Sequence, residues 1–244
     1  RDLHSFPTRR SSDLVENIYM NGLLIGHSRE IMDAKIDDII AFCINPNEFL
    51  LVVNSATRYK DYEWFVKKSA GYKVEVADVS DGYAMLALQG PKALDILENL
   101  IPQIKGIARF HIRQDKIFNA SVYITRTGYT GEDGVEIMLP NGQIEALWNA
   151  LLKLGVKPCG LGARDVLRLE AGYLLNGADA NQTKTPYEAN CGWVVKLTKE
   201  NFIGKAALEA KKAAGFTTKL KAFHLKAPGV PREGCKVFYH GVET

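Results

Sequence analysis

The chain has 244 residues, of which 46% are hydrophobic, and a formal net charge of only +3. This is enough to bury a sizeable core in one large or two smaller domains, and the interspersed charges argue against the broad basic surface of a nucleic-acid-binding protein. The four cysteines are far apart with no CxxC pair, and no apolar run reaches the roughly 18 residues of a membrane span, so we expect a soluble protein of a reducing compartment without structural zinc or a disulfide framework.

Residues 1–14 have no apolar periodicity and lack the apolar core of a secretion signal. We expect them to be a disordered leader or sequence foreign to the protein. A basic transit peptide is the alternative, which Asp2 and Asp13 disfavour.

Apolar runs and amphipathic stretches then follow in mixed order. They predict a strand at 49–53, a helix at 55–70, strands at 73–77 and 83–88 around a turn at 80–82, a helix from Pro91, strands at 110–112, 116–118, 121–125 and 135–139, helices at 144–154, 161–171 and 202–214, and strands at 218–225 and 236–240. This mixed order indicates an α+β fold rather than a doubly wound parallel sheet.

Local residues predict some helix boundaries and buried faces. The helix at 55–70 is expected to begin at an N-cap formed by Asn54 or Ser55 and to end at Gly71. Two apolar helix faces are predicted to be buried, formed by Ala93, Leu94, Ile96, Leu97 and Leu100 in one helix and by Leu147, Leu151, Leu152 and Leu154 in another.

The most distinctive stretch is residues 126–137, Arg-Thr-Gly-Tyr-Thr-Gly-Glu-Asp-Gly-Val-Glu-Ile. From Gly128 to Glu136 it contains three glycines, an aromatic residue and three carboxylates, and it continues into an apolar strand. Glycine at this density has a high entropic cost, so the backbone is expected to turn tightly or to approach another group closely. A simple chain reversal needs neither so many glycines nor so many acids. We interpret the stretch as a binding loop.

Two charged constellations have both a chemical and a structural interpretation. Asp37-Asp38 precedes the apolar residues 39–42, where desolvation can change a carboxyl pKa, but a capping or turn role is the interpretation that these residues alone favour. Within residues 160–172, the residues alone likewise favour a solvated helix face held by ion pairs, formed by Arg164, Arg168 and Glu170.

Three common catalytic or cofactor motifs are not supported. Gly160 and Gly162 give half of a dinucleotide fingerprint, but Asp165 stands where its third glycine belongs. The five histidines show no HExxH spacing, so a catalytic metal is not expected, and a serine hydrolase has no GxSxG elbow to support it.

Several separated motifs nevertheless form an ordered set from about residue 33 to the end of the chain. They are residues 36–38 and 49–54, 84–91, 126–136, 160–172, 192–193 and 201–205. Together they resemble the aminomethyltransferases, the T-proteins of the glycine cleavage system. The resemblance implies interleaved folate-binding α/β subdomains followed by the start of a C-terminal β-barrel.

This resemblance also sets the expected domain organisation. Residues 15–200 would be the folate-binding core, truncated at its N-terminus, and residues 201–244 the truncated beginning of the barrel domain. The strand at 236–240 would then lack its pairing partner.

Members of the family move the methylene of a lipoyl-bound aminomethyl group to tetrahydrofolate, releasing ammonia and leaving 5,10-methylenetetrahydrofolate. The resemblance therefore implies tetrahydrofolate as the cofactor and the lipoyl carrier protein (H-protein) of the glycine cleavage system as the partner. It also implies a cytoplasmic location, or a mitochondrial one in a eukaryote. No nucleic-acid or membrane partner is expected.

Site residues are carried over from matching motif positions. Asp38 is implied to be catalytic, hydrogen-bonding the folate and assisting proton movement as the folate nitrogen attacks the methylene carbon. Glu136 matches a carboxylate that accepts adjacent N–H donors of the pterin. Tyr129 matches an aromatic side chain that packs on the flat ligand, and Arg164 a guanidinium suited to a folate oxygen or carboxylate. Further residues implied to line the folate cavity are Val52, Asn54 and Tyr173.

Other function classes stay open. Folate-dependent demethylases and the folate domains of dimethylglycine and sarcosine dehydrogenases share much of the glycine loop, although no flavin-binding Rossmann segment is visible. A folate-binding accessory protein of iron–sulfur cluster assembly shares the fold, but its usual Lys-Gly-Cys-Tyr-x-Gly-Gln-Glu motif has a cysteine where this chain has Asn201. An α+β module whose glycine loop is only a turn would bind no folate.

Overall fold

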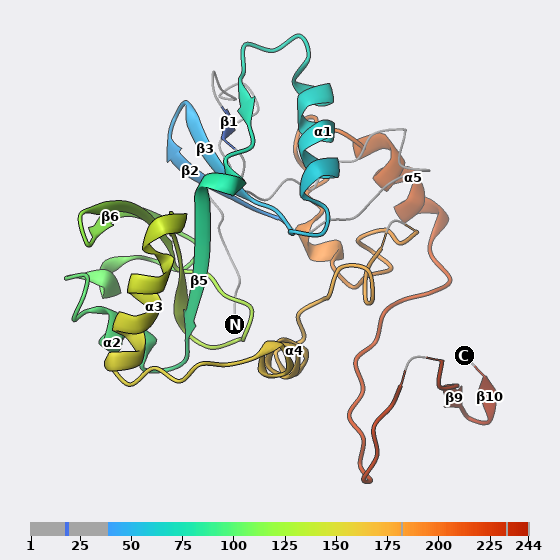
Figure 1. Ribbon diagram of the computed structural model, residues 1–244. Helices are drawn as coiled ribbons and strands as arrows, with labels where there is room; N and C mark the ends of the chain where they lie inside the picture. Colours follow the sequence, from blue (N-terminus) through green and yellow to red (C-terminus); the bar gives the residue numbers. More distant parts are fainter. Residues whose placement is uncertain (1–17, 20–38, 182, 233, 244) are drawn as a thin grey trace.

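A four-stranded antiparallel sheet forms the centre of the computed structural model, which describes residues 18–19, 39–181, 183–232 and 234–243. The strands run in the order β5-β8-β7-β6 (Figure 1). Their bounds are Tyr83–Gln89 for β5, Ile112–Ile117 for β6, Ala120–Thr125 for β7 and Gly134–Pro140 for β8. Helices and strands alternate irregularly along the chain, which confirms the predicted α+β class.

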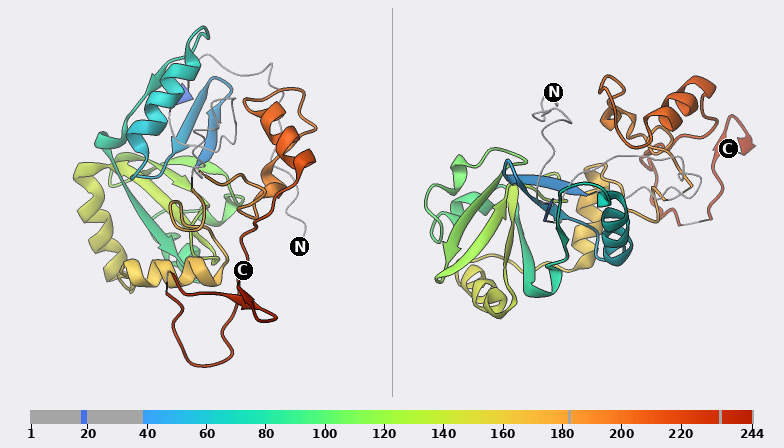
Figure 2. Two further views of the ribbon diagram at one scale, coloured as in Figure 1. Left: turned by 90° about the vertical axis from the view of Figure 1, so that its right-hand side faces the viewer. Right: turned by 90° about the horizontal axis from the view of Figure 1, so that it is seen from above.

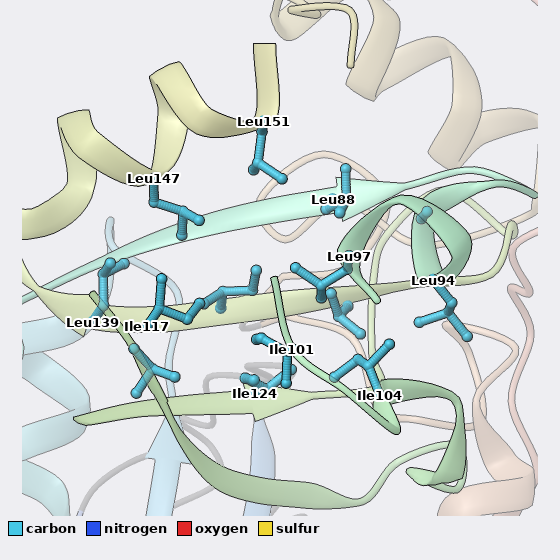
Figure 3. Close-up of a cluster of buried hydrophobic side chains, with 14 of the residues drawn as sticks. Leu88, Leu94, Leu97, Ile101, Ile104, Ile117, Ile124, Leu139, Leu147 and Leu151 are labelled. Carbon is cyan, nitrogen blue, oxygen red and sulfur yellow. The ribbon is translucent and has the colours of Figure 1, made fainter. Parts of the chain in front are cut away.

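One face of this sheet carries the main hydrophobic core. Val135, Ile137 and Leu139 alternate along β8 and all point into it. Helices α2 (Ala93–Leu97) and α3 (Ile144–Lys153) cover this face. Figure 3 shows side chains from both helices pointing toward the strands, including Leu97 and Leu147, which are fully buried.

The opposite face of the sheet carries a smaller cluster around Met138 of β8. An antiparallel hairpin of β2 (Ile40–Asn45) and β3 (Glu48–Val52) packs there through Phe42 and Leu50. Because neighbouring residues of a strand face opposite sides, Glu136 shares this face with Met138. The candidate site residue Glu136 therefore lies on the hairpin side of the sheet.

Of the remaining elements, α5 (Lys205–Ala214) and the C-terminal strands extend away from the sheet on one side (Figure 2). Strand β1 (Ile18–Tyr19) pairs in parallel with β4 (Val76–Ala77), and β9 (Phe238–Tyr239) pairs with β10 (Val242–Glu243). The other α-helices are α1 (Arg58–Ser69) and α4 (Leu161–Glu170), and 3-10 turns lie at Ser80–Gly82, Ile104–Gly106, Asn141–Gln143 and Gly192–Val194. Within the described ranges, no helix combines the length and apolar character needed to span a membrane.

Two predicted helix starts are wrong. Helix α1 begins at Arg58 without a side-chain cap, because the Thr57 amide donates to the Asn54 carbonyl at 3.1 Å and closes a separate turn. Helix α5 begins at Lys205 rather than residue 202, because Gly204 before it adopts a left-handed φ of 89°.

The strand predictions need similar corrections. Residues 110–118 give the single strand β6 instead of two, and residues 73–75 are not extended in a sheet. Strands β4 and β5 lie on either side of the turn at 80–82 as predicted, and their pairing partners are β1 and β8 respectively. The predicted strand at 218–225 is absent because a β-strand needs a ladder of partners, and in this segment the backbone bond from Leu220 to Glu188 is isolated.

The predicted helix faces are confirmed in part, since Ile96 is only half-buried. In α2, Ala93, Leu94 and Leu97 are buried, and Leu100 packs against the same core. In helix α3, Leu147 and Leu151 are buried, whereas Leu152 and the following Leu154 are each 37% exposed. The expectation that the strand at 236–240 lacks a pairing partner is wrong, because β9 (Phe238–Tyr239) pairs with β10 (Val242–Glu243) in an antiparallel ladder.

Candidate functional site

The glycine-rich loop joins β7 to β8, and an ion pair closes its base. The Arg126 guanidinium donates to both carboxylate oxygens of Asp133, with Nη2 to Oδ2 at 2.6 Å and Nε to Oδ1 at 3.1 Å. Nη1 of the same arginine also donates to the Ile107 carbonyl at 2.8 Å. Hydrogen bonding from Arg126 lowers the pKa of Asp133 below its usual range. The two ends of the loop are thus held together by a bidentate, charge-assisted contact.

The side-chain amide of Gln89, at the end of β5, fills the inside of this loop. Its Nε2 lies 3.1 Å from the carbonyl oxygens of both Thr127 and Val135. Its Oε1 accepts the hydroxyl of Thr130 at 3.0 Å. One amide therefore satisfies backbone and side-chain groups on both arms of the loop, which fixes the loop to the sheet.

Each glycine of the loop is required for a different structural reason. A Cβ at Gly128 would lie 1.8 Å from Oε1 of Gln89, and a Cβ at Gly134 would lie 2.5 Å from the Leu88 carbonyl oxygen. Gly131 has a φ of 75° and approaches Ala171, whose Cβ would be 2.8 Å from an added Cβ. The close-approach interpretation of the glycines is therefore confirmed.

The close approach of Gly131 to Ala171 brings three predicted site residues together. The Tyr129 ring stacks on the Tyr173 ring with centroids 5.7 Å apart and planes 20° from parallel. The Arg164 guanidinium carbon lies 4.8 Å from the Tyr129 ring centroid, within cation–π range. Residues from the loop and from helix α4 with its following turn thus form one aromatic and cationic group.

The end of α4 explains where Tyr173 lies. The Tyr173 amide donates to the Arg168 carbonyl at 2.8 Å, and the Gly172 amide donates to the Leu169 carbonyl at 3.0 Å. With Gly172 at a φ of 75°, these two bonds form a Schellman motif. The motif turns the chain sharply after α4 and directs Tyr173 back toward Tyr129, whose hydroxyl donates to the Leu174 carbonyl.

Arg168 is buried rather than on a solvated helix face, which corrects the sequence-based interpretation. Only 7% of it is exposed. Burial opposes its charge, but hydrogen bonds to Asp165 and Asp179 outweigh that effect and raise the pKa of Arg168. Its guanidinium also donates to the Tyr173 carbonyl at 3.2 Å. Arg168 therefore holds the turn that carries Tyr173.

Glu136 is half-buried on β8, just beyond the loop. The Thr127 hydroxyl donates to its Oε2 at 2.6 Å, so one carboxylate oxygen has a fixed protein donor. An ionised carboxylate has only acceptor sites, about four in all. Glu136 therefore has the chemistry to accept further N–H donors from a ligand.

The two predicted lining residues near the hairpin occupy its end. Val52 is the last residue of β3 and packs against the Met138 cluster, on the sheet face that Glu136 shares. Asn54 lies in the turn before α1, where its carbonyl accepts the Thr57 amide. Asp37 and Asp38 lie outside the described residues, which begin again at the buried Ile39.

Gln89, Thr127 and Arg168 are contributors to this arrangement whose roles the sequence did not reveal. Gln89 belongs to the motif at 84–91 and Thr127 to the motif at 126–136. Membership of these motifs was the sequence signal that could have pointed to them. For Arg168 the signal was Asp165 one helical turn earlier, but that spacing is equally typical of a surface ion pair. Among the described residues, no group of three or more histidine, cysteine, aspartate or glutamate side chains is placed to hold a metal ion.

Comparisons with known proteins match this chain to a family. The family described as GCVT N-terminal domain matches residues 33–199. An aminomethyltransferase of Caldanaerobacter subterraneus subsp. tengcongensis is 42% identical over 241 residues, covering 96% of this chain and 63% of the relative. One of Herpetosiphon aurantiacus is 43% identical over 203 residues, covering 83% and 56% respectively.

A solved structure is similar as well. The crystal structure of glycine cleavage system aminomethyltransferase T from Bartonella henselae has a TM-score of 0.67 and 31% identity, covering 79% of this chain and 55% of that one. These matches confirm the predicted resemblance. The chain spans between 55% and 63% of the length of these three relatives.

Proposed function

Since the chain belongs to the aminomethyltransferase family, the T-proteins of the glycine cleavage system, we propose that it binds tetrahydrofolate and catalyses aminomethyl transfer. The substrate would be an aminomethyl group bound through sulfur to the lipoyl arm of a carrier protein, the H-protein. The products would be ammonia, the reduced lipoyl thiol and 5,10-methylenetetrahydrofolate.

When bound, tetrahydrofolate supplies the two amine nitrogens that receive the methylene. Its two N–H bonds are replaced by bonds to carbon, while the C–S and C–N bonds of the aminomethyl group break. One of the released protons goes to the lipoyl sulfur and the other to the departing ammonia, so the transfer requires no external oxidant or reductant.

Glu136 is the proposed anchor for the pterin ring. The fit rests on its position beside the loop and on the bond from Thr127, which leaves the second carboxylate oxygen and the remaining lone pairs of Oε2 for ligand donors. A flat ring edge with adjacent N–H groups matches a carboxylate in a bidentate geometry. In this role Glu136 binds and orients the ring without taking part in proton transfer.

Tyr129, Tyr173 and Arg164 are proposed to hold the flat and anionic parts of the ligand. Aromatic side chains favour stacked contacts with a ring system, and guanidinium groups bind carboxylates or carbonyl oxygens in a planar geometry. Their assembly at the glycine loop supports this assignment. Val52 and Asn54 are proposed to line the same cavity from the hairpin side.

Asp38 is the proposed catalytic residue. It would accept a proton from the attacking amine as the new C–N bond forms, which is the work of a general base placed within hydrogen-bond reach. In the sequence, Asp38 comes two residues before β2 (Ile40–Asn45), and β2 belongs to the hairpin that packs on the Glu136 face. This proximity in the chain supports the role.

The domain organisation follows the same premise. We propose that residues 15–200 form the folate-binding core and that residues 201–244 begin a C-terminal β-barrel. We also propose that the protein acts in the cytoplasm, or in the mitochondrion of a eukaryote, where the H-protein presents its lipoyl arm.

The observation that carries the proposal is the contact between the glycine loop and the end of α4, which brings Tyr129 together with Arg164 and Tyr173. The test is a transfer assay with aminomethylated H-protein, in which ammonia is measured with and without tetrahydrofolate. We expect ammonia release that requires both components. Release of formaldehyde from dimethylglycine or sarcosine, with no ammonia from the H-protein, would contradict the proposal in favour of a demethylase.

A further inference from the structure

The side chains of Thr125, Thr127 and Glu136 form a continuous hydrogen-bonded series. The Thr127 hydroxyl lies 2.6 Å from Oε2 of Glu136, and the Thr125 hydroxyl lies 2.7 Å from that of Thr127. Thr125 is completely buried and Thr127 is only 6% exposed. Both hydroxyls are therefore shielded from solvent, and their protein partners satisfy them.

The direction of each proton in this series follows from donor counting. An ionised carboxylate carries no proton, so Thr127 must donate its single hydroxyl proton to Glu136. Thr127 then interacts with Thr125 only as an acceptor. The Thr125 hydroxyl proton has two acceptors within reach, the Thr127 hydroxyl at 2.7 Å and the Glu136 backbone carbonyl at 3.4 Å, and the shorter contact is the one that Thr125 donates to. Hydrogen bonds aligned in one direction strengthen one another, and the bond at the charged end is the strongest kind in the series.

The strand register makes this arrangement rigid. Thr125 of β7 is paired directly with Glu136 of β8, so both residues point to the same face of the sheet. Thr127 follows two residues later, where the chain leaves β7 for the loop. The terminal torsion of a glutamate side chain is otherwise broad. The hydrogen bond from Thr127, which is itself held by Thr125, restricts the Glu136 carboxylate to a single orientation.

We propose that Thr127, supported by Thr125, is a positioning residue that fixes the Glu136 carboxylate for binding the pterin ring of tetrahydrofolate. This inference rests on the proposed function and adds to it a residue that acts only through Glu136. With Thr127 in place, the carboxylate is held in a single orientation before the ligand arrives, so less orientational freedom is lost on binding.

The experiment is a double-mutant cycle on the tetrahydrofolate dissociation constant, using Thr127→Val and Glu136→Ala singly and together. Valine keeps the shape of threonine and removes the hydroxyl. In the chain that retains Glu136, we expect Thr127→Val to weaken binding by roughly tenfold, as for loss of a hydrogen bond to a charged group. In the Glu136→Ala background we expect the same change to have less than about a twofold effect, because contacts in series are not additive.

Two controls separate positioning from general loss of structure. Thr127→Ser keeps the hydroxyl and should bind close to the level of the unmutated chain. Thr185→Val removes a similar bond elsewhere, from the Thr185 hydroxyl to Oε2 of Glu188 at 2.7 Å, and should leave the dissociation constant unchanged. If Thr127→Val fails to fold, Thr125→Val replaces it and is expected to weaken binding about threefold through the shortened series.

The outcomes distinguish this inference from the proposed function. If the unmutated chain binds no tetrahydrofolate, the proposed function fails and the inference fails with it. If the unmutated chain binds while Thr127→Val has the same affinity, or weakens binding equally with and without Glu136, the positioning role alone is overturned. Unchanged binding in a folded Thr125→Val variant, where it is the replacement, overturns it as well.

Discussion

The ring of Tyr129 stacks on the ring of Tyr173, with centroids 5.7 Å apart and planes 20° from parallel. This contact joins the loop between β7 and β8 to the turn after α4. Gln89 holds the loop through a hydrogen bond to the Thr127 carbonyl, and Arg168 holds the turn through a hydrogen bond to the Tyr173 carbonyl. Two separately anchored segments thus meet at the position where the proposed ligand would stack.

The aromatic pair predicts how substitutions change tetrahydrofolate affinity. Tyr129→Ala should weaken binding about tenfold, because it removes the stacking surface, whereas Tyr129→Phe keeps the ring and should weaken it by less than about threefold. Fluorescence or calorimetric titration measures both. Tyr72→Ala, at a tyrosine that is 74% exposed, is the matched control. Equal affinities for Tyr129→Ala and the control would contradict the stacking role.

The close approach of Gly128 to Gln89 predicts a paired effect on stability. Gly128→Ala should lower the free energy of unfolding by about 1–3 kcal/mol, because the new methyl displaces the Gln89 amide from its partners. In a Gln89→Ala background the same substitution should be less destabilising. Gly142→Ala, where an added Cβ has open space, should change stability by less than about 0.5 kcal/mol. Urea unfolding of the four variants tests this, and additive effects would argue against the contact.

The ion pair between Arg126 and Asp133 predicts a pH dependence. Because the pKa of Asp133 is lowered in the folded state, its contribution to stability is fully present above the unfolded value of about 3.9 and is lost as pH falls through the lower folded pKa. Unfolding of the unmutated chain and of Asp133→Asn should therefore differ at pH 6 and converge toward pH 3. A difference that stays constant with pH would contradict this role for Asp133.

Arg168 should be among the most sensitive positions outside the main core. Arg168→Met removes the donors to Asp165, Asp179 and the Tyr173 carbonyl. It leaves both carboxylates without their cation, and since Asp179 is the less exposed of the two, we expect a loss of about 3–5 kcal/mol of stability. Tetrahydrofolate binding by the fraction that stays folded should also weaken, because the Tyr173 turn is released. Arg232→Met, at an exposed arginine, should change neither quantity measurably. A stable, fully binding Arg168→Met variant would show that the turn does not depend on this arginine.

Substitution of Asp38 is expected to lower the rate of aminomethyl transfer with little change in the affinity for tetrahydrofolate. Asp38→Ala should abolish ammonia release from aminomethylated H-protein while changing the tetrahydrofolate dissociation constant by less than about threefold, because a general base acts on the transition state more than on the bound ground state. Single-turnover kinetics combined with equilibrium titration measures both quantities. Proportional losses of rate and affinity would contradict a catalytic role for Asp38.

The sequence predicted those parts of the site that depend on local backbone requirements. The density of glycines between Gly128 and Gly134 indicated a close approach, and the structure supplies the neighbours. The role of Gln89 was not predictable from local patterns, because its carbonyl partners Thr127 and Val135 are 38 and 46 positions further along the chain.

Two other features could not be predicted from the sequence, namely which charged side chains are buried and which strands pair. An arginine three residues after an aspartate on a helix has the same local pattern whether it is exposed or buried, so the position of Arg168 depends on Asp179 from the following turn. The alternating residues at 218–225 have strand character, but a strand forms only where a neighbouring strand accepts its hydrogen bonds. Helix and strand patterns in residues 83–153 were more reliable because most of their apolar faces meet in the core.

The central claim is that Glu136 anchors tetrahydrofolate beside the glycine loop, and calorimetric titration of the chain and of Glu136→Ala with tetrahydrofolate tests it most directly. We expect one binding site per chain and at least about tenfold weaker binding in the variant, since the ring donors lose their charged acceptor. No binding by the unmutated chain, or an identical dissociation constant in a correctly folded Glu136→Ala variant, would contradict the claim.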